Sequence, residues 1–265
     1  MMEIPFTKLH GAENDFLLSW AHQAPAENLP EIARRICARI TGIGADGWML
    51  VSTESGGLKT RLFNPDGTEP EISGNGTRCA AAFGLLKGVV SGPAVSITTG
   101  AGNKMLHLIS RNGDRFLFEM NMGVPALEDL HAKLRLAGTD YDATVLNVGN
   151  PQCAIFVDEF PAAWRHAAKE AECHRRFPNH SNVSFVRVVD RHTIESLFYE
   201  RGVGETRSSG TGSTGAATAA ILRKVAESPV EIRTPAGSMT LRWDDSVYLT
   251  GPAELIGEGR FFLDL

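Results

Sequence analysis

Two stretches of the chain carry the same pattern, a serine followed by a glycine-rich turn that runs straight into an alanine-rich helix. The first, SGNGTRCAAA, begins at Ser73, and the second, SGTGSTGAA, begins at Ser209. Each serine is expected at a helix N-cap, where its side chain can accept a hydrogen bond from a backbone amide of the first turn. The glycines leave neighbouring N–H groups accessible. Both turns therefore predict a helix start that can receive an anion.

The helices that follow these turns are apolar nearly all round. Residues 80–86 and 216–222 contain mostly alanine, leucine and isoleucine. A surface helix would show a polar face, so this composition predicts two helices buried inside a wrapping sheet.

Polar landmarks elsewhere in the chain repeat at the same separation as the two serines. Adding 136 to the number of each first residue gives the second in four pairs: Asn14 and Asn150, Asp46 and Asn182, Asn64 and Glu200, and Ser73 and Ser209. Cys37 and Cys173, and Glu69 and Glu205, follow the same shift. A fixed offset held across helices and strands indicates an internal duplication. We expect two similar domains, residues 1–122 and 123–265, with the last strand free to pack back on the first domain.

Local patterns place the other elements. Apolar residues at helical spacing (Leu29, Ile32, Ile36 and Ile40) predict a helix over residues 28–40. Strands are expected at residues 4–10, 17–20, 48–51, 59–63, 94–99, 104–109 and 115–122.

Composition narrows the functional classes. The net charge of −5 is spread without runs, which gives no electrostatic footprint for nucleic acid. No apolar run approaches the 18 residues of a membrane span, and the N-terminus has no signal-peptide pattern, so a soluble cytoplasmic protein is expected. The four cysteines lie outside any CxxC motif and are expected to be reduced and mostly buried. The histidine spacings predict no metal site.

A pair of equivalent helix starts suggests a reaction. If both faced one ligand in the cleft between the domains, a group on each side of one carbon could remove a proton and return it from the opposite face. The backbone amides of the turns would hold a carboxylate and spread the charge of the carbanion. This arrangement inverts a stereocentre.

The chain resembles diaminopimelate epimerase over essentially its whole length, and more loosely the superfamily of cofactor-independent racemases. The matching motifs are Lys8-x-His10-Gly11-x-x-Asn14-Asp15-Phe16, Gly42-Ile43-Gly44-Ala45-Asp46-Gly47, Phe63-Asn64-x-Asp66-Gly67-x-Glu69, Gly74-Asn75-Gly76-x-Arg78-Cys79, Gly149-Asn150-Pro151, Glu200-Arg201-Gly202-x-Gly204-Glu205-Thr206 and Gly210-Thr211-Gly212. The resemblance implies an α+β fold of two pseudo-symmetric domains. Each would be a curled mixed β-sheet around a central buried helix, with the active site in the interdomain cleft.

The resemblance also implies an isomerase that needs neither pyridoxal phosphate nor another cofactor and acts on a small amino-acid substrate in lysine synthesis. The substrate contacts it implies are Asn14, Asn64, Asn150, Asn182, Glu200 and Arg201, with Gly74, Asn75, Gly210 and Thr211 on the reacting carboxylate. The sequence leaves the oligomeric state open, a homodimer included.

Three positions depart from the family pattern. The family has catalytic cysteines where this chain has Ser73 and Ser209, and a histidine where it has Gln152. A thiol titrates near about 8.5, whereas an alcohol lies closer to the roughly 15.7 of water. Even five units of difference correspond to about 7 kcal/mol against forming the base.

Three interpretations remain open. Cysteines replaced by design would explain both serines but not Gln152, which favours natural divergence. A diverged enzyme could use the serines as hydrogen-bonding acids and take its base from a carboxylate, with Glu200 the first candidate and Glu13 the second. A binding protein that kept the pocket and lost the chemistry is the third.

Overall fold

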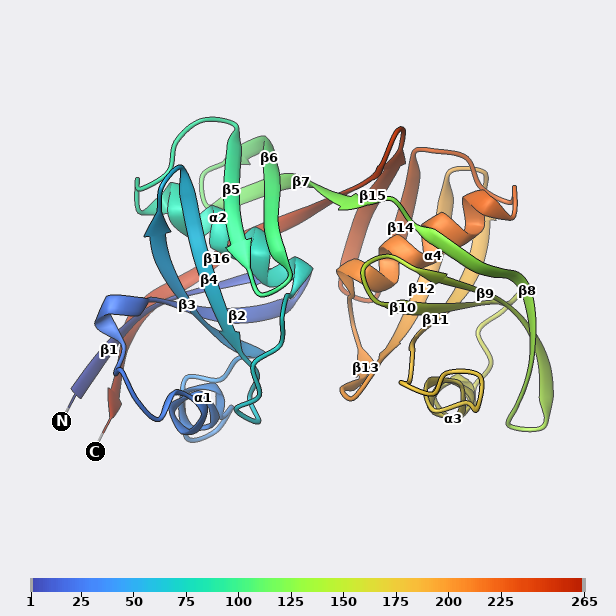
Figure 1. Cartoon of the computed structure of the whole chain (residues 1–265), viewed down its shortest axis with the longest axis horizontal. Coiled ribbons are helices and arrows are strands. Elements are labelled where there is room, and N and C mark those ends of the chain that lie inside the picture. Colours follow the sequence, from blue (N-terminus) through green and yellow to red (C-terminus); the bar gives the residue numbers. More distant parts are fainter. Residues whose placement is uncertain (1, 264–265) are drawn as a thin grey trace. The chain divides into compact units, whose positions relative to one another are not determined.

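A computed structural model describes residues 2–263 of the chain, and their contacts divide it into two compact units (Figure 1). Unit 1 runs up to Met120 and takes up the chain again at Gly251, while unit 2 comprises Asn121–Thr250. Strand β16 (Val247–Leu263) begins in unit 2 and lies mostly in unit 1. None of the helices described is long and apolar enough to cross a membrane.

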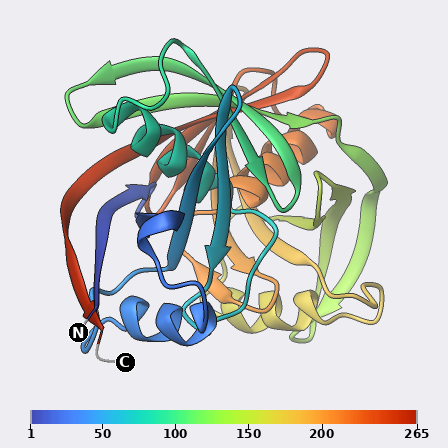
Figure 2. The same cartoon turned by 60° about the vertical axis from the view of Figure 1, so that its left-hand side comes forward.

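The sheet of unit 1 closes on itself. Its strands follow the order β1 to β7 and then β16, and β1 pairs with β16 to complete the ring. This last pairing is antiparallel, with Ile4 opposite Phe261, and the two strands run side by side in Figure 2. The first seven strands are β1 (Met2–Gly11), β2 (Asn14–Trp20), β3 (Gly47–Glu54), β4 (Gly57–Phe63), β5 (Ala94–Thr99), β6 (Gly102–Asn112) and β7 (Arg115–Gly123).

The sheet of unit 2 repeats this order along the chain. It runs β8–β9–β10–β11–β12–β14–β15–β16, and the short strand β13 pairs with β12. The strands are β8 (Ala126–Leu136), β9 (Thr139–Asn147), β10 (Pro151–Phe156), β11 (Asn182–Asp190), β12 (Thr193–Glu200), β13 (Gly204–Thr206), β14 (Val230–Thr234) and β15 (Gly237–Trp243).

Two helical crossovers recur in each unit, as an internal duplication predicts. Helix α1 (Leu29–Cys37) joins the parallel strands β2 and β3, and α3 (Trp164–Glu172) joins the parallel strands β10 and β11. Helix α2 (Gly74–Leu86) lies between the parallel strands β4 and β5, and α4 (Gly210–Leu222) lies between β12 and β14. The register of the second pair repeats to within one residue of the same offset, since Gly57 faces Ser96 and Thr193 faces Glu231.

Helices α2 and α4 are the buried centres of the two units, as their composition predicts. Ala80, Ala81 and Ala82 of α2 are fully buried, and so are Ala216 and Ala217 of α4. Small side chains on every face let the surrounding strands approach the helix from several directions. The curled sheet of each unit therefore wraps a helix whose N-terminal turn carries the serine.

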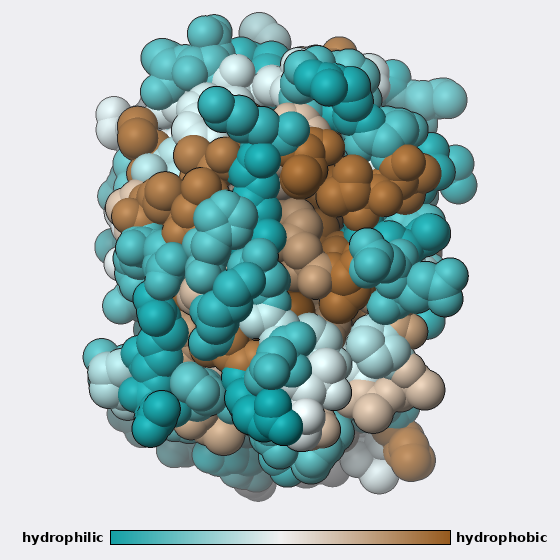
Figure 3. Space-filling model, turned by 90° about the vertical axis from the view of Figure 1, so that its right-hand side faces the viewer, coloured by the Kyte–Doolittle hydropathy of each residue, from teal (hydrophilic) through white to brown (hydrophobic). Residues whose placement is uncertain are grey.

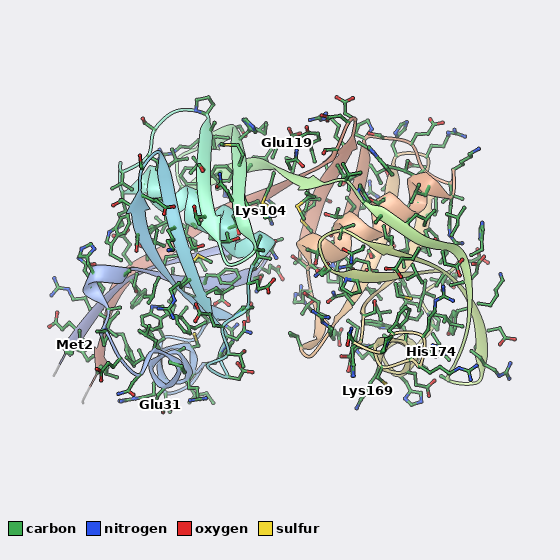
Figure 4. The ribbon with its side chains drawn as sticks, viewed as in Figure 1. Met2, Glu31, Lys104, Glu119, Lys169 and His174 are labelled. Atoms are coloured by element: carbon green, nitrogen blue, oxygen red, sulfur yellow. The ribbon has the colours of Figure 1, made fainter. Side chains whose placement is uncertain are left out.

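The other two helices are amphipathic and lie on the surface. Ile32 and Ile36 of α1, and Ala167, Ala168 and Ala171 of α3, are buried. Figure 4 shows the labelled side chains of Glu31 and Lys169 pointing away from the strands. These helices cover one side of their sheets, and the two serines of the predicted site lie at the starts of the central helices α2 and α4.

The helix predicted over residues 28–40 ends earlier than expected, at Cys37. The chain turns back on itself there, because the N–H groups of Ile43 and Gly44 donate to the carbonyl oxygen of Ile36. A Cβ on Gly42 would lie 2.1 Å from the carbonyl oxygen of Arg35, so this return needs glycine. Ile40 consequently lies outside the helix and is 96% exposed, which corrects its assignment to the apolar face.

Strand β8 forms the outer edge of the sheet in unit 2. It carries the charged residues Glu128, Asp129, Lys133 and Arg135, and its register with β9 shifts twice. Charges and bulges on an edge strand discourage pairing with another sheet.

Figure 3 views the molecule from the right-hand side of Figure 1 and shows apolar side chains gathered in the upper half of that face among polar ones.

Candidate active site

The turn before α2 has the predicted N-cap. Ser73 has an extended backbone, and its Oγ accepts a hydrogen bond from the N–H of Gly76 at 3.1 Å. The hydroxyl of Thr77 donates to the carbonyl oxygen of Ser73 at 2.7 Å, which closes the turn a second time. The first amides of a helix have no partner within it, so this turn presents N–H groups to a ligand.

The turn before α4 repeats this geometry. Ser209 has the same extended backbone, and its Oγ accepts from the N–H of Gly212 at 3.0 Å. Gly212 is required here, because a Cβ would lie 2.7 Å from Cδ1 of Phe198 and 2.9 Å from Oγ of Ser209. The two serines are thus confirmed as equivalent helix caps. Ser209 is the more deeply buried of the two.

A chain of side-chain amides supports the turn in unit 1. Nδ2 of Asn75 donates to Oδ1 of Asn14 at 3.3 Å, and Nδ2 of Asn14 donates to Oδ2 of Asp46 at 2.7 Å. Asn75 accepts in turn from the guanidinium of Arg78. Two residues predicted to contact substrate, Asn14 and Asn75, therefore lie in direct contact at the start of α2.

Arg78 lies inside unit 1 with no exposed surface. Its Nε donates to the carbonyl oxygen of Pro252 at 3.0 Å, which joins α2 to β16 across 174 positions of sequence. Burial lowers the pKa of Arg78 to about 10, so the guanidinium stays charged at neutral pH. The sequence analysis assigned no role to Arg78. The feature that could have identified it is a single cation within an apolar, alanine-rich helix.

Charged residues brace the turn between β1 and β2. Asp15 forms ion pairs with Lys8 at 2.9 Å and with Arg39 at 2.8 Å, and Arg39 also pairs with Asp46. Burial acts to raise the pKa of Asp15, but hydrogen bonds from Arg39 and Lys8 outweigh it and hold the pKa below its ordinary value. Asp46, which holds Asn14, is thus part of a network of fixed charges.

Asn150 in unit 2 lies at the position equivalent to Asn14 in unit 1, but different residues form the hydrogen bonds of its side chain. Nδ2 of Asn150 donates to Oγ1 of Thr211 at 3.3 Å, and the two residues are separated by 61 positions, as Asn14 and Asn75 are. Nε2 of Gln152 donates to Oδ1 of Asn150 at 2.7 Å. Asn182 donates to the carbonyl oxygen of Pro151 at 3.0 Å and accepts from the N–H of Arg201 at 3.1 Å.

Glu200 ends strand β12 beside the second serine. Its carboxylate accepts hydrogen bonds from the hydroxyl of Thr206, at 2.9 Å, and from the side chain of Ser209. Burial raises the pKa of Glu200 above its ordinary value, while these two hydrogen bonds act in the opposite direction. The equivalent residue of unit 1 is Asn64, which donates to Oγ1 of Thr68 at 2.9 Å and cannot titrate. This carboxylate therefore sets the surroundings of Ser209 apart from those of Ser73.

A pocket of about 270 Å³ opens beside Ser73 within unit 1. Ser73 and Thr77 line one part of it, and the charged residues Lys59, Arg61, Glu69 and Glu71 line another. A larger pocket, of about 450 Å³, lies against Trp20, Phe83 and Lys87 and contains none of the predicted site residues. Ser73 therefore borders a pocket that a small ligand or solvent can enter.

Glu13, the second candidate base, is placed less favourably for proton transfer than Glu200. Glu13 occupies an exposed tight turn with a positive φ of 60°, where its N–H donates to Nδ1 of His10. The side chain of Arg201 is exposed and donates to the carbonyl oxygen of Asn179. Burial raises the pKa of Cys79 to about 12, so the thiol nearest to Ser73 along α2 does not supply a base at neutral pH.

The cysteines are free thiols throughout the part of the chain that the structure describes. Cys37, Cys79 and Cys153 are buried and Cys173 is exposed, as expected for a reduced set that is mostly in the core. Burial raises the pKa of Cys37 and of Cys153 to about 12.

The fold is shared with solved structures of an epimerase and of a phenazine biosynthesis protein. It superposes on a hydroxyproline epimerase from Agrobacterium vitis with a TM-score of 0.73 and 14% identity, covering 99% of this chain and 93% of the other. A phenazine biosynthesis protein of the PhzF family from Bacillus anthracis gives a TM-score of 0.78 at 14% identity, covering 99% of this chain and all of the other.

The chain belongs to the diaminopimelate epimerase family. The family model described as diaminopimelate epimerase matches residues 6–128 and 144–256. The diaminopimelate epimerase of Moorella thermoacetica is 36% identical over 98% of this chain and 99% of its own length. That of Methanococcus maripaludis is 33% identical over 96% and 98%. The resemblance seen in the motifs is confirmed, and the protein is an isomerase of the epimerase kind.

Proposed function

We propose that this protein interconverts LL- and meso-diaminopimelate without pyridoxal phosphate, by removing the α-proton from one face of the carbon and returning a proton to the other. The observation that carries this proposal is the repeated turn, in which Ser73 and Ser209 cap equivalent helices beside equivalent asparagines. Membership of the diaminopimelate epimerase family supports the choice of substrate.

The groups proposed to bind substrate come from the two equivalent turns and the residues around them. The amides of Gly74, Asn75, Gly210 and Thr211 would hold the carboxylate at the reacting carbon, because a helix N-terminus favours an anion. The other polar groups that would contact the substrate are Asn14, Asn64, Asn150, Asn182, Glu200 and Arg201. Carboxylate recognition suits this set, since most of its members supply N–H donors.

Glu200 supplies the base that the missing thiol cannot. In the proposed step the α-carbon gives its proton to Oγ of Ser209, and the hydroxyl proton of Ser209 passes to Glu200 along their hydrogen bond. The hydroxyl of Ser73 gives a proton to the opposite face and regains one from solvent through the pocket beside it. Glu200 then releases its proton to solvent, so the protein returns to its starting state and the substrate is inverted with no net gain or loss of protons.

A second function is favoured by the same carboxylate. An isomerase or dehydratase that acts on another amino or imino acid could use Glu200 as its base and keep the serines as hydrogen-bond donors. The raised pKa of Glu200 suits that role, because a base is most effective when its pKa lies near the working pH. A protein that only binds amino acids is the remaining alternative.

Proton exchange in D₂O distinguishes these functions. The unmodified protein should exchange the α-proton of LL- or meso-diaminopimelate and should be stabilised by either, by about 2.7 kcal/mol at 100 times the dissociation constant. Exchange of a different amino acid, with no response to diaminopimelate, would support the second function. Stabilisation by diaminopimelate without exchange, even after cysteine is restored at positions 73 and 209, would support the binding protein.

A further inference from the structure

Gln152 occupies a buried position behind the turn of α4. It lies on β10, where it is opposite Leu146 of β9 and Asn182 of β11, and it is 1% exposed. A Cβ added to Gly215 would lie 2.9 Å from Cγ of Gln152, so the glutamine packs directly against the helix. The side chain of Gln152 is therefore enclosed beside α4.

The hydrogen bonds of Gln152 determine how Asn150 is oriented. Nε2 of Gln152 donates to Oδ1 of Asn150 at 2.7 Å, and Nδ2 of Asn150 then donates to Oγ1 of Thr211 at 3.3 Å. An amide that accepts on one side presents its nitrogen on the other. Gln152 therefore decides that Asn150 faces the turn of α4 with its N–H groups.

Unit 1 reaches the same result with different residues. The oxygen of Asn14 accepts from Asn75, and its nitrogen donates to Asp46. The position equivalent to Gln152 is Phe16, which cannot donate a hydrogen bond. In both units the amide oxygen of the asparagine is occupied by a protein donor. Each NH₂ group retains a second hydrogen, which can be donated to a ligand.

The side-chain oxygen of Gln152 lowers the stability of the protein, and packing alone does not explain why a glutamine stands here. Its Oε1 is buried, and no hydrogen-bond donor among residues 2–263 reaches it. A buried acceptor without a partner destabilises a protein, and an apolar side chain of similar length would avoid this. A polar residue kept at such a position is expected where function depends on it.

We propose that Gln152 is a positioning residue that locks Asn150 as a hydrogen-bond donor to a carboxylate oxygen of the ligand. The identity of the ligand rests on the proposed function, but the lock itself does not. The side-chain oxygen of Asn150 already accepts a hydrogen bond from Gln152, so only its NH₂ group is left for the ligand. This part of the site therefore favours a hydrogen-bond acceptor on the ligand and disfavours an ammonium group. Gln152 thus serves in ligand selection instead of proton transfer.

Two substitutions separate positioning from packing. Gln152→Met keeps the length of the side chain and removes both the donor and the buried acceptor, so the melting temperature should change little while Asn150 loses its lock. Gln152→Glu cannot donate when ionised but can when protonated, so the lock should be lost at neutral pH and return as the pH falls. Thr218→Val is the matched control, because Thr218 of α4 also has a buried oxygen without a partner in the described chain and has no hydrogen bond to Asn150.

The first readout is solvent exchange of the side-chain NH₂ protons of Asn150, measured by NMR on the ligand-free protein. The second is the dissociation constant of meso-diaminopimelate. Gln152→Met should accelerate the exchange and weaken binding by roughly 10-fold each, the effect of one hydrogen bond. Gln152→Glu should match it at neutral pH and recover in acid. Thr218→Val should leave both quantities unchanged.

The two readouts keep this inference distinct from the proposed function. Unchanged exchange of the Asn150 amide in Gln152→Met, or equal losses in Thr218→Val, would overturn the positioning role whatever the ligand. Failure of the unmodified protein to bind meso-diaminopimelate would count against the proposed substrate, and the exchange measurement would still decide the role of Gln152. Accelerated exchange with unchanged affinity for diaminopimelate would overturn the claim that the lock serves the ligand.

Discussion

The side chain of Ser209 is hydrogen-bonded to the carboxylate of Glu200, and burial raises the pKa of that carboxylate above its ordinary value. The same serine accepts the N–H of Gly212. The hydroxyl of Ser209 therefore lies between the first turn of α4 and a carboxylate. The equivalent place in unit 1 is taken by Asn64, so this arrangement belongs to one half of the duplicated fold.

The first prediction is that α-proton exchange depends on the ionisation of Glu200. The base must be deprotonated to accept a proton, so exchange should fall as the pH decreases through the raised pKa of Glu200. Glu200→Gln should reduce exchange at saturating substrate by about 100-fold or more. Glu13→Gln is the control, and a loss as large as that of Glu200→Gln would contradict this assignment.

The second prediction concerns stability. A carboxylate with a raised pKa in the folded state is more easily ionised in the unfolded chain, so its contribution to the free energy of unfolding falls as the pH rises above about 4.3. Glu200→Gln should therefore be more stable than the unmodified protein near pH 7. The difference should vanish in acid, where both states hold the proton. Melting curves from pH 4 to pH 8 would test this. A stability difference that does not change with pH would show that ionisation of Glu200 is not its origin.

The third prediction concerns the serines. Cysteine at both positions 73 and 209 should raise the rate of exchange by orders of magnitude, because a thiol gives up its proton far more readily than an alcohol. A single cysteine should give exchange without efficient inversion. Chiral analysis of the product measures the two outcomes separately. Equal rates in the unmodified and doubly substituted proteins would mean that neither side chain takes part in proton transfer.

The fourth prediction compares the two turn glycines. A Cβ on Gly212 would lie 2.7 Å from the ring of Phe198, whereas on Gly76 it would lie 2.9 Å from the terminal methyl of Met49. A methionine end can move and a packed ring cannot easily do so. Gly212→Ala should therefore cost roughly 1–3 kcal/mol, and Gly76→Ala less. Denaturant unfolding of both variants provides the measurement, and the reverse order would show that the turn of unit 2 is the more adaptable.

Features that depend on near neighbours could be predicted from the residues. The capping of α2 by Ser73 joins positions three apart, and the burial of α2 and α4 follows from their own composition. The helix over residues 28–40 shows where this fails. Its apolar spacing continues to Ile40, but the return of the chain to the carbonyl of Ile36 ends it at Cys37.

The sequence by itself determined the duplication, the two capped turns and the family, because each is written in the order of residues along the chain. Only the tertiary structure decided that Glu200 contacts Ser209, that Gln152 orients Asn150, and that Arg78 joins α2 to the carbonyl of Pro252. The physical reason is that burial and hydrogen-bond partners are properties of the packed chain. A side chain's pKa and orientation follow from its neighbours in space, and the sequence names those neighbours only when they are close along it.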